Sequence, residues 1–132
     1  MDGIGKELQG KSILIVDDDT RNTFALVSYL ETMDIELHTA EDGLGAIELL
    51  GRYSGIKLIL MDIMMPGMDG FETIGRIRSN PSTAHIPIIA LTAKAMKGDR
   101  AKCLEAGASE YVSKPINMKE LLEKMTDMLN TV

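Results

Sequence analysis

Leu58-Ile59-Leu60-Met61-Asp62-Ile63-Met64-Met65-Pro66-Gly67-Met68-Asp69-Gly70 is the stretch that decides the fold of this 132-residue chain. Its first four residues are apolar without polar alternation, which predicts a strand buried on both faces of a sheet. Asp62 follows directly, and Pro66 and Gly67 suit the central positions of a type II turn. Asp69 then has the side chain to cap a following helix. In open α/β sheets, ligands bind at the carboxyl ends of the strands. Asp62 is therefore a candidate functional residue.

On both sides of this stretch, apolar runs alternate with amphipathic segments, five of each. We predict strands over residues 12–16, 35–40, 58–61, 87–91 and 110–113, and helices over 21–33, 43–53, 70–78, 95–106 and 118–129. Parallel strands need crossover connections, so the alternation predicts an α/β fold, with a parallel sheet covered by helices on both faces. The last helix has an apolar stripe at i, i+3, i+4 spacing and is predicted to pack on the core.

The composition is that of a single globular domain, 45% hydrophobic and 26% charged. A formal charge of −6 argues against non-specific binding to nucleic acid or to an anionic membrane. No apolar stretch reaches membrane-spanning length, since Lys57 and Asp62 interrupt the longest candidate, so we predict no membrane insertion. The single cysteine, Cys103, fits a reducing compartment, and with no signal-peptide core at the N-terminus we predict a cytoplasmic protein.

Polar side chains follow four of the predicted strands: Asp17 and Asp18, Asp62, Thr92, and Lys114. In a parallel sheet these carboxyl ends share one edge, so the side chains can converge there. Two carboxylates ~4 Å apart repel by about 4 kcal/mol at an effective dielectric near 20. Such a cluster therefore calls for protonation or for a cation, and oxygen ligands without histidine or thiolate favour Mg²⁺.

A metal site beside Lys114 and the Thr92 hydroxyl suits the transfer of a phosphoryl group. Asp62 would then be the acceptor, a carboxylate nucleophile that forms an aspartyl phosphate.

Four motifs, taken together and in this order, resemble the receiver domain of two-component response regulators. They are Ile13-Leu14-Ile15-Val16-Asp17-Asp18, Met61-Asp62-Ile63-Met64-Met65-Pro66-Gly67-Met68-Asp69-Gly70, Ala90-Leu91-Thr92-Ala93 and Tyr111-Val112-Ser113-Lys114-Pro115. The resemblance runs from about Lys11 to Leu129. It implies a flavodoxin-like fold, a five-stranded parallel sheet in the order 2-1-3-4-5 with helices on both faces. We accordingly divide the chain into a leader or linker, residues 1–10, and a receiver domain, residues 11–132.

The resemblance also implies roles for several residues of these motifs. Asp62 would be the phosphoacceptor, and Mg²⁺, for which Mn²⁺ could substitute, would be held by Asp17, Asp18, Asp62 and the backbone carbonyl of Met64. Lys114 would contact the phosphoryl oxygens. Thr92 and Tyr111 would carry the signal by changing position after phosphorylation. The peptide bond before Pro115 would be cis, a form that only about 5–6% of such bonds adopt.

The function implied is that of a switch. It accepts a phosphoryl group from a phosphohistidine of a histidine kinase or histidine phosphotransfer protein. It then signals to a downstream effector that the sequence does not name. Beyond its own phosphorylation and dephosphorylation we expect no enzymatic activity. Two alternatives stay open. A small phosphohydrolase would use Asp17 as its nucleophile, and a docking module would act without phosphorylation.

Overall fold

The computed structural model describes residues 8–65, 67–93 and 99–130. Its five strands form one parallel sheet in the order β2-β1-β3-β4-β5, as predicted. The strands are β1 (Ser12–Val16), β2 (Glu36–Ala40), β3 (Ile56–Asp62), β4 (Ile88–Thr92) and β5 (Glu110–Ser113). The helices are α1 (Thr20–Leu30), the 3-10 turn η2 (Glu31–Met33), α2 (Gly43–Arg52), α3 (Gly70–Ser79), α4 (Asp99–Ala106) and α5 (Met118–Asn130).

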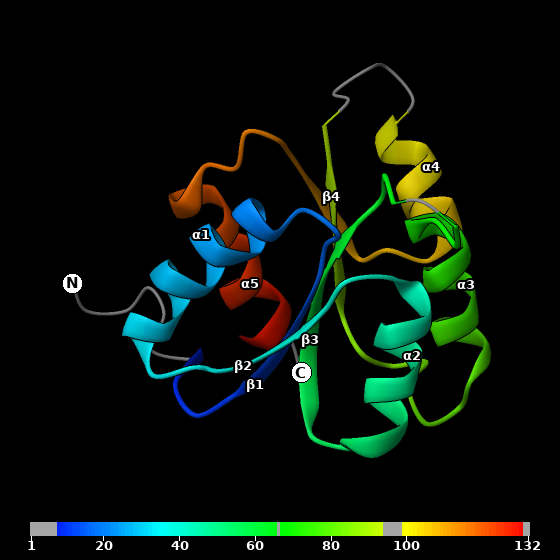
Figure 1. Cartoon of the computed structure of the whole chain (residues 1–132), viewed down its shortest axis with the longest axis horizontal. Helices are drawn as coiled ribbons and strands as arrows, with labels where there is room; N and C mark the ends of the chain where they lie inside the picture. Colours follow the sequence, from blue (N-terminus) through cyan, green and yellow to red (C-terminus); the bar gives the residue numbers. More distant parts are fainter. Residues whose placement is uncertain (1–7, 66, 94–98, 131–132) are drawn as a thin grey trace.

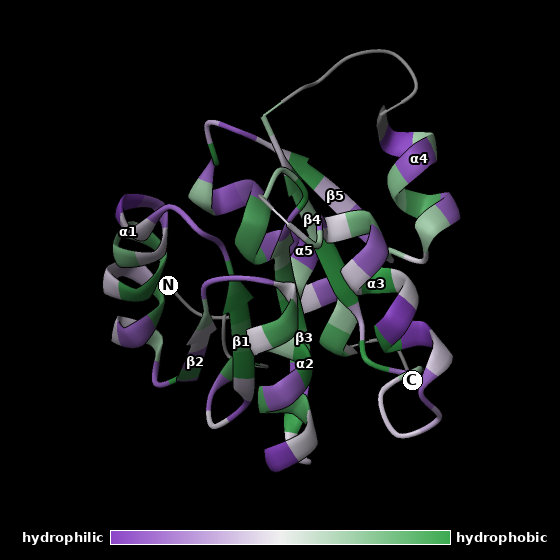
Figure 2. Ribbon diagram, turned by 45° about the vertical axis from the view of Figure 1, so that its right-hand side comes forward, coloured by the Kyte–Doolittle hydropathy of each residue, from purple (hydrophilic) through white to green (hydrophobic). Residues whose placement is uncertain are grey.

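The sheet lies between two layers of helices (Figure 1). Helices α1 and α5 cover one face, and α2, α3 and α4 cover the other. Alternate residues of each central strand face opposite layers: in β1, Ile13 and Ile15 pack with α1 and α5, whereas Leu14 and Val16 pack with α2 and α3. Both faces are buried, which explains why the middle of each central strand is apolar (Figure 2).

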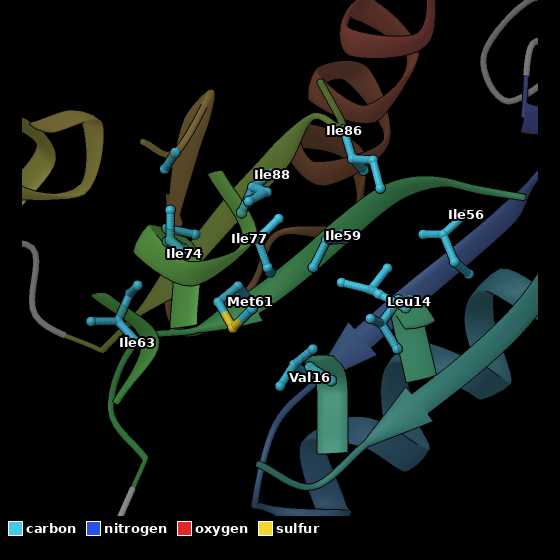
Figure 3. Close-up of a cluster of buried hydrophobic side chains, with 14 of the residues drawn as sticks. Leu14, Val16, Ile56, Ile59, Met61, Ile63, Ile74, Ile77, Ile86 and Ile88 are labelled. Atoms are coloured by element: carbon cyan, nitrogen blue, oxygen red, sulfur yellow. The ribbon is translucent and has the colours of Figure 1, made fainter. Parts of the chain in front are cut away.

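The core on the α2–α3–α4 side is built largely from branched aliphatic side chains (Figure 3). Ile59 and Met61 of β3 point toward Ile74 and Ile77, which line the buried side of α3. The opposite core includes Leu121, Leu122 and Met125 of α5, which are at most 2% exposed, so the predicted stripe of the last helix is confirmed.

Several element boundaries differ from the prediction. The first helix ends at Leu30 and continues as the 3-10 turn η2, which closes on Asp34 in the left-handed conformation (φ 62°). In α2 the buried side runs through Ala46 and Leu50, an i, i+4 pair, whereas Leu44 is 63% exposed and lies on a different face. The described part of the fourth predicted helix begins at Asp99, and residues 95–98 lie outside the described residues.

Residues 8–10 pack against the domain. The Leu8 side chain is fully buried in the core beneath α1 and α5, and the Gly10 N–H donates to the Asp34 carbonyl at 2.8 Å. Residues 1–7 lie outside the described residues, so a leader with its boundary at residue 10 stays a prediction. Among the described residues, no helix has the length and apolar character needed to cross a bilayer.

Arg78 joins three segments at the end of the sheet opposite the strand carboxyl termini. Its Nε donates to the carbonyl of Gly107 at 2.9 Å, and its Nη1 donates to the carbonyls of Ala84 and Ile86 at 3.0 and 2.6 Å. Gly107 follows the last residue of α4 with a φ of +117°, a backbone conformation that glycine adopts readily at the end of a helix. Arg78 thus fixes the C-terminal end of α4 and the α3–β4 connection to one another.

We predict that Arg78→Met lowers the free energy of unfolding by about 2–3 kcal/mol, because it leaves partly buried carbonyls without their charged donor. Arg76→Met is the matched control, since Arg76 pairs with Glu72 on the exposed side of the same helix and should cost less than about 0.5 kcal/mol. Urea denaturation of both variants measures the difference. Equal losses would show that the Arg78 contacts contribute nothing.

Candidate functional site

The parallel topology brings four strand ends to one edge of the sheet. Asp17 directly follows β1, and its N–H donates to the carbonyl of Ala40 at the end of β2. Asp62 is the last residue of β3, the strand between β1 and β4. On the other side, the N–H of Lys114 donates to the Thr92 carbonyl at 2.7 Å, which holds the ends of β4 and β5 together. The edge predicted from the sequence therefore exists.

Three carboxylates gather at this edge. Asp17, Asp18 and Asp62 each place one oxygen within 4.8 Å of the other two. Asp17 is 2% exposed and Asp62 is 3% exposed, whereas Asp18 is open to solvent. Asp17 Oδ1 also accepts the N–H of Asp19 at 2.8 Å, which orients its carboxylate. The structure thus confirms that these three residues lie together, with two of them withdrawn from water.

Lys114 provides positive charge between the two buried aspartates. Its Nζ lies 3.4 Å from Asp17 Oδ2 and 3.4 Å from Asp62 Oδ1. The Lys114 side chain is 18% exposed, so solvent screens these contacts less than it screens surface ion pairs. The peptide bond between Lys114 and Pro115 is cis, as the family resemblance implies. Lys114 is placed to contact a negatively charged group bound at Asp62.

The loop between β3 and α3 frames the Asp62 side chain. The N–H of Met64 donates to Asp62 Oδ1 at 3.2 Å. Farther along, Gly67 has a φ of +75°, as a type II turn requires at its third position, although Pro66 lies outside the described residues. The loop ends at Asp69, whose Oδ1 accepts the N–H of Glu72 at 2.9 Å and caps α3 as predicted.

Burial and like charge act together on Asp62. Withdrawal from water and, after it, the charge of Asp17 raise the pKa of the Asp62 carboxyl to about 6, against the opposing effects of Lys114 and the Met64 N–H. Ionisation of Asp62 is therefore unfavourable in the folded protein when no cation is bound beside it. The same cost favours any added positive charge at this position.

The residues proposed for signalling occupy the neighbouring strands. Thr92 is the last residue of β4 and is 4% exposed. Tyr111 lies in β5 opposite Ala90, and its half-buried ring packs against the core on the α2–α3–α4 side. Tyr111 lies in β5, which ends just before Lys114, and Thr92 lies in the neighbouring strand β4. Their roles in a switch stay predictions.

The donor set fits a divalent cation with a preference for oxygen. Three carboxylates meet there, and no histidine or thiolate belongs to the group that the described residues form. The net charge of Asp17, Asp18, Asp62 and Lys114 is −2 when all are ionised, so a 2+ ion would balance it. Mg²⁺ characteristically binds through a few carboxylates together with water and a phosphate oxygen. The residues present therefore fit the ion that the sequence predicted.

A protein-family model matches the sequence over most of the chain. Residues 13–126 match the model of the response regulator receiver domain. The chain belongs to this family. Receiver domains are signalling modules, and the order of the five strands and the acidic edge of this chain are those of a receiver.

Individual relatives agree with this assignment. Response regulator PleD of Caulobacter vibrioides is 42% identical over 105 residues, a match that covers 80% of this chain and 23% of PleD. The chain therefore spans about a quarter of that relative. The receiver domain of sensor histidine kinase PA1611 from Pseudomonas aeruginosa is 33% identical, with a TM-score of 0.85 over 92% of this chain and 99% of the other. Its structure contains a magnesium ion coordinated in the active site cleft.

A third relative was solved in a complex. The receiver domain of the response regulator Ssk1 of Saccharomyces cerevisiae, crystallised with the histidine phosphotransfer protein Ypd1, is 30% identical. It has a TM-score of 0.83, and the match covers 92% of this chain and 90% of that one.

We predict that Asp62→Asn stabilises the metal-free protein at neutral pH and not at pH 4. The folded-state pKa of about 6 lies above the ordinary value of 3.8, so the folded protein retains a proton that the unfolded chain has lost. Wild-type stability relative to the variant therefore falls as the pH rises from 3.8 to 6 and stays constant above that window. A gain of about 1 kcal/mol would raise the Tm by roughly 3–5 °C.

The measurement is thermal unfolding in EDTA between pH 4 and pH 8. Asp42→Asn is the control, because it removes a carboxylate from an exposed helix cap at which asparagine is equally good. A stabilisation by Asp62→Asn that does not change with pH would contradict the raised pKa.

Proposed function

We propose that this chain is a phosphoacceptor switch, in which Asp62 accepts a phosphoryl group from a phosphohistidine. The observation that carries the proposal is the meeting of Asp17, Asp18 and Asp62 with Lys114 at one edge of the sheet. Asp62 supplies an oxygen nucleophile at the end of a buried strand, where its position is fixed by the sheet. The single cysteine fits a reducing compartment and so supports a cytoplasmic location for it.

The reaction transfers phosphorus from nitrogen to oxygen. An Asp62 carboxylate oxygen attacks the phosphorus atom, the nitrogen–phosphorus bond breaks, and its electron pair returns to the imidazole, which takes up a proton. Lys114 contacts oxygens of the transferred group and balances the charge that it brings to Asp62. Hydrolysis later breaks the acyl phosphate, releases inorganic phosphate and restores the Asp62 carboxylate. The chain therefore modifies itself and turns over no separate substrate.

A magnesium ion would be held by Asp17, Asp18, Asp62 and the Met64 backbone carbonyl, with Mn²⁺ as a substitute. When bound, it would supply positive charge that stabilises phosphoryl oxygens in the transition state. Asp17 and Asp18 would serve to hold the ion. The magnesium reported in the PA1611 receiver supports this part of the proposal.

The partner that delivers the phosphoryl group would be a histidine kinase or a histidine phosphotransfer protein. The complex of the related Ssk1 receiver with Ypd1 supports the second kind of donor. Phosphorylation would change the positions of Thr92 and Tyr111 and so alter the surface that an effector binds.

We expect acetyl phosphate to add one phosphate to the native chain in the presence of Mg²⁺ and none in EDTA, as read by mass spectrometry of the intact protein. Asp62→Asn should remain unmodified because it lacks the nucleophile. Asp17→Asn, which keeps Asp62, should be modified slowly. A label that persists in Asp62→Asn and disappears in Asp17→Asn would instead favour the phosphohydrolase alternative.

Thr92→Ala should still accept phosphate, since Thr92 is not the nucleophile, and should lose the changes in backbone amide chemical shifts that spread to β5 after phosphorylation. Thr92→Ser retains the hydroxyl and should keep them. If the β5 shifts of Thr92→Ala still change as in the native protein, Thr92 does not transmit the signal.

If the native chain never accepts phosphate in these experiments, that result would support the docking alternative.

A further inference from the structure

The β3–α3 loop owes its position to contacts at its far end as well as to Asp62. The Gly70 N–H donates to the Ile63 carbonyl at 3.0 Å, which closes the loop at its base. The carbonyl of Asp69 accepts both the N–H of Thr73 at 3.0 Å and the Thr73 hydroxyl at 2.8 Å. Thr73 is fully buried, so its side chain has little freedom. Asp69, and with it the loop that carries Met64, is held by Thr73.

The first residue of α2 lies directly against this anchor. A Cβ added at Gly43 would overlap the Thr73 hydroxyl oxygen, and it would lie 3.0 Å from Met68 Sδ and 3.3 Å from Met68 Cγ. Gly43 is itself buried, whereas Gly51, near the other end of α2, has no heavy atom within 4 Å of its added Cβ. Helix α2 therefore approaches the β3–α3 loop and α3 closely at Gly43, and only a hydrogen fits between them.

We infer that Gly43 is a positioning residue for the acidic site, acting through Thr73 and Met68 on the loop that orients Met64 beside Asp62. The inference rests on the proposed function, in which the Met64 carbonyl and Asp62 share an ion. Met68 is a flexible side chain and can move away from a methyl group at position 43. The Thr73 hydroxyl cannot move without breaking its hydrogen bond to the Asp69 carbonyl, which then keeps only the Thr73 N–H, so the added methyl group changes how the end of the loop is held.

The test compares Gly43→Ala with Gly51→Ala, the same substitution in the same helix at an open position. Amide ¹H–¹⁵N spectra of the metal-free proteins report the position of Met64, and calorimetric titration with Mg²⁺ reports the affinity of the site. Gly43→Ala should shift the Met64 and Asp62 amide signals and weaken Mg²⁺ binding by about 10-fold, the usual size of an effect on residues that orient metal ligands. Gly51→Ala should change neither.

The double variant Gly43→Ala/Thr73→Ala checks the route. With the Thr73 hydroxyl removed, the added methyl group has room, so the double variant should match Thr73→Ala alone in Met64 shift and in Mg²⁺ affinity. If Gly43→Ala does not fold, Thr73→Ala tests the same path, since it removes the hydroxyl that holds Asp69 and should move the Met64 amide signal.

Native-like Met64 and Asp62 signals in folded Gly43→Ala, or in Thr73→Ala where Gly43→Ala is unfolded, would overturn the inference. These outcomes are separable from failure of the proposed function. If the native chain itself neither binds Mg²⁺ nor accepts phosphate, the proposed function fails whatever the variants do. If the native chain does both and Gly43→Ala behaves identically, only the role of Gly43 is wrong.

Discussion

The burial of two carboxylates side by side, only partly offset by one lysine, is the constraint on which the acidic edge depends. Asp17 and Asp62 are both nearly inaccessible to water, and Lys114 lies 3.4 Å from each. Burial and, after it, the charge of Asp17 raise the pKa of Asp62 to about 6, because Lys114 offsets these effects only in part. A cation bound at this edge would therefore stabilise the ionised forms of the buried carboxylates.

The sheet makes this costly arrangement possible. β1 and β3 are the central strands, buried on both faces, and the side chains at their carboxyl ends cannot move apart without disrupting the core on either side. The aliphatic core on both faces of the sheet stabilises the fold enough to keep two buried carboxylates close together at one edge. Lys114 reaches the same edge from β5 because its N–H is bound to the Thr92 carbonyl.

Most of this architecture follows from local sequence patterns. Buried parallel strands are continuous apolar runs, and a polar residue after such a run must lie at the common edge, so Asp17, Asp62 and Lys114 could be placed together from the sequence. The contacts of Arg78 and the close approach at Gly43 could not. They depend on how α3 and α4, or α2 and α3, meet in space, and neither an exposed-looking arginine nor a helix-starting glycine indicates its distant partner.

The most direct test of the shared-ion account is a crystal of the native chain soaked in Mn²⁺, with diffraction data collected at the manganese absorption edge. We predict one strong anomalous peak at the position held by Asp17, Asp18, Asp62 and the Met64 carbonyl, with ligand distances of about 2.1 Å, as expected for a small hard cation. The absence of a peak there, with the side chains placed as described and Mn²⁺ present in excess, would contradict the account.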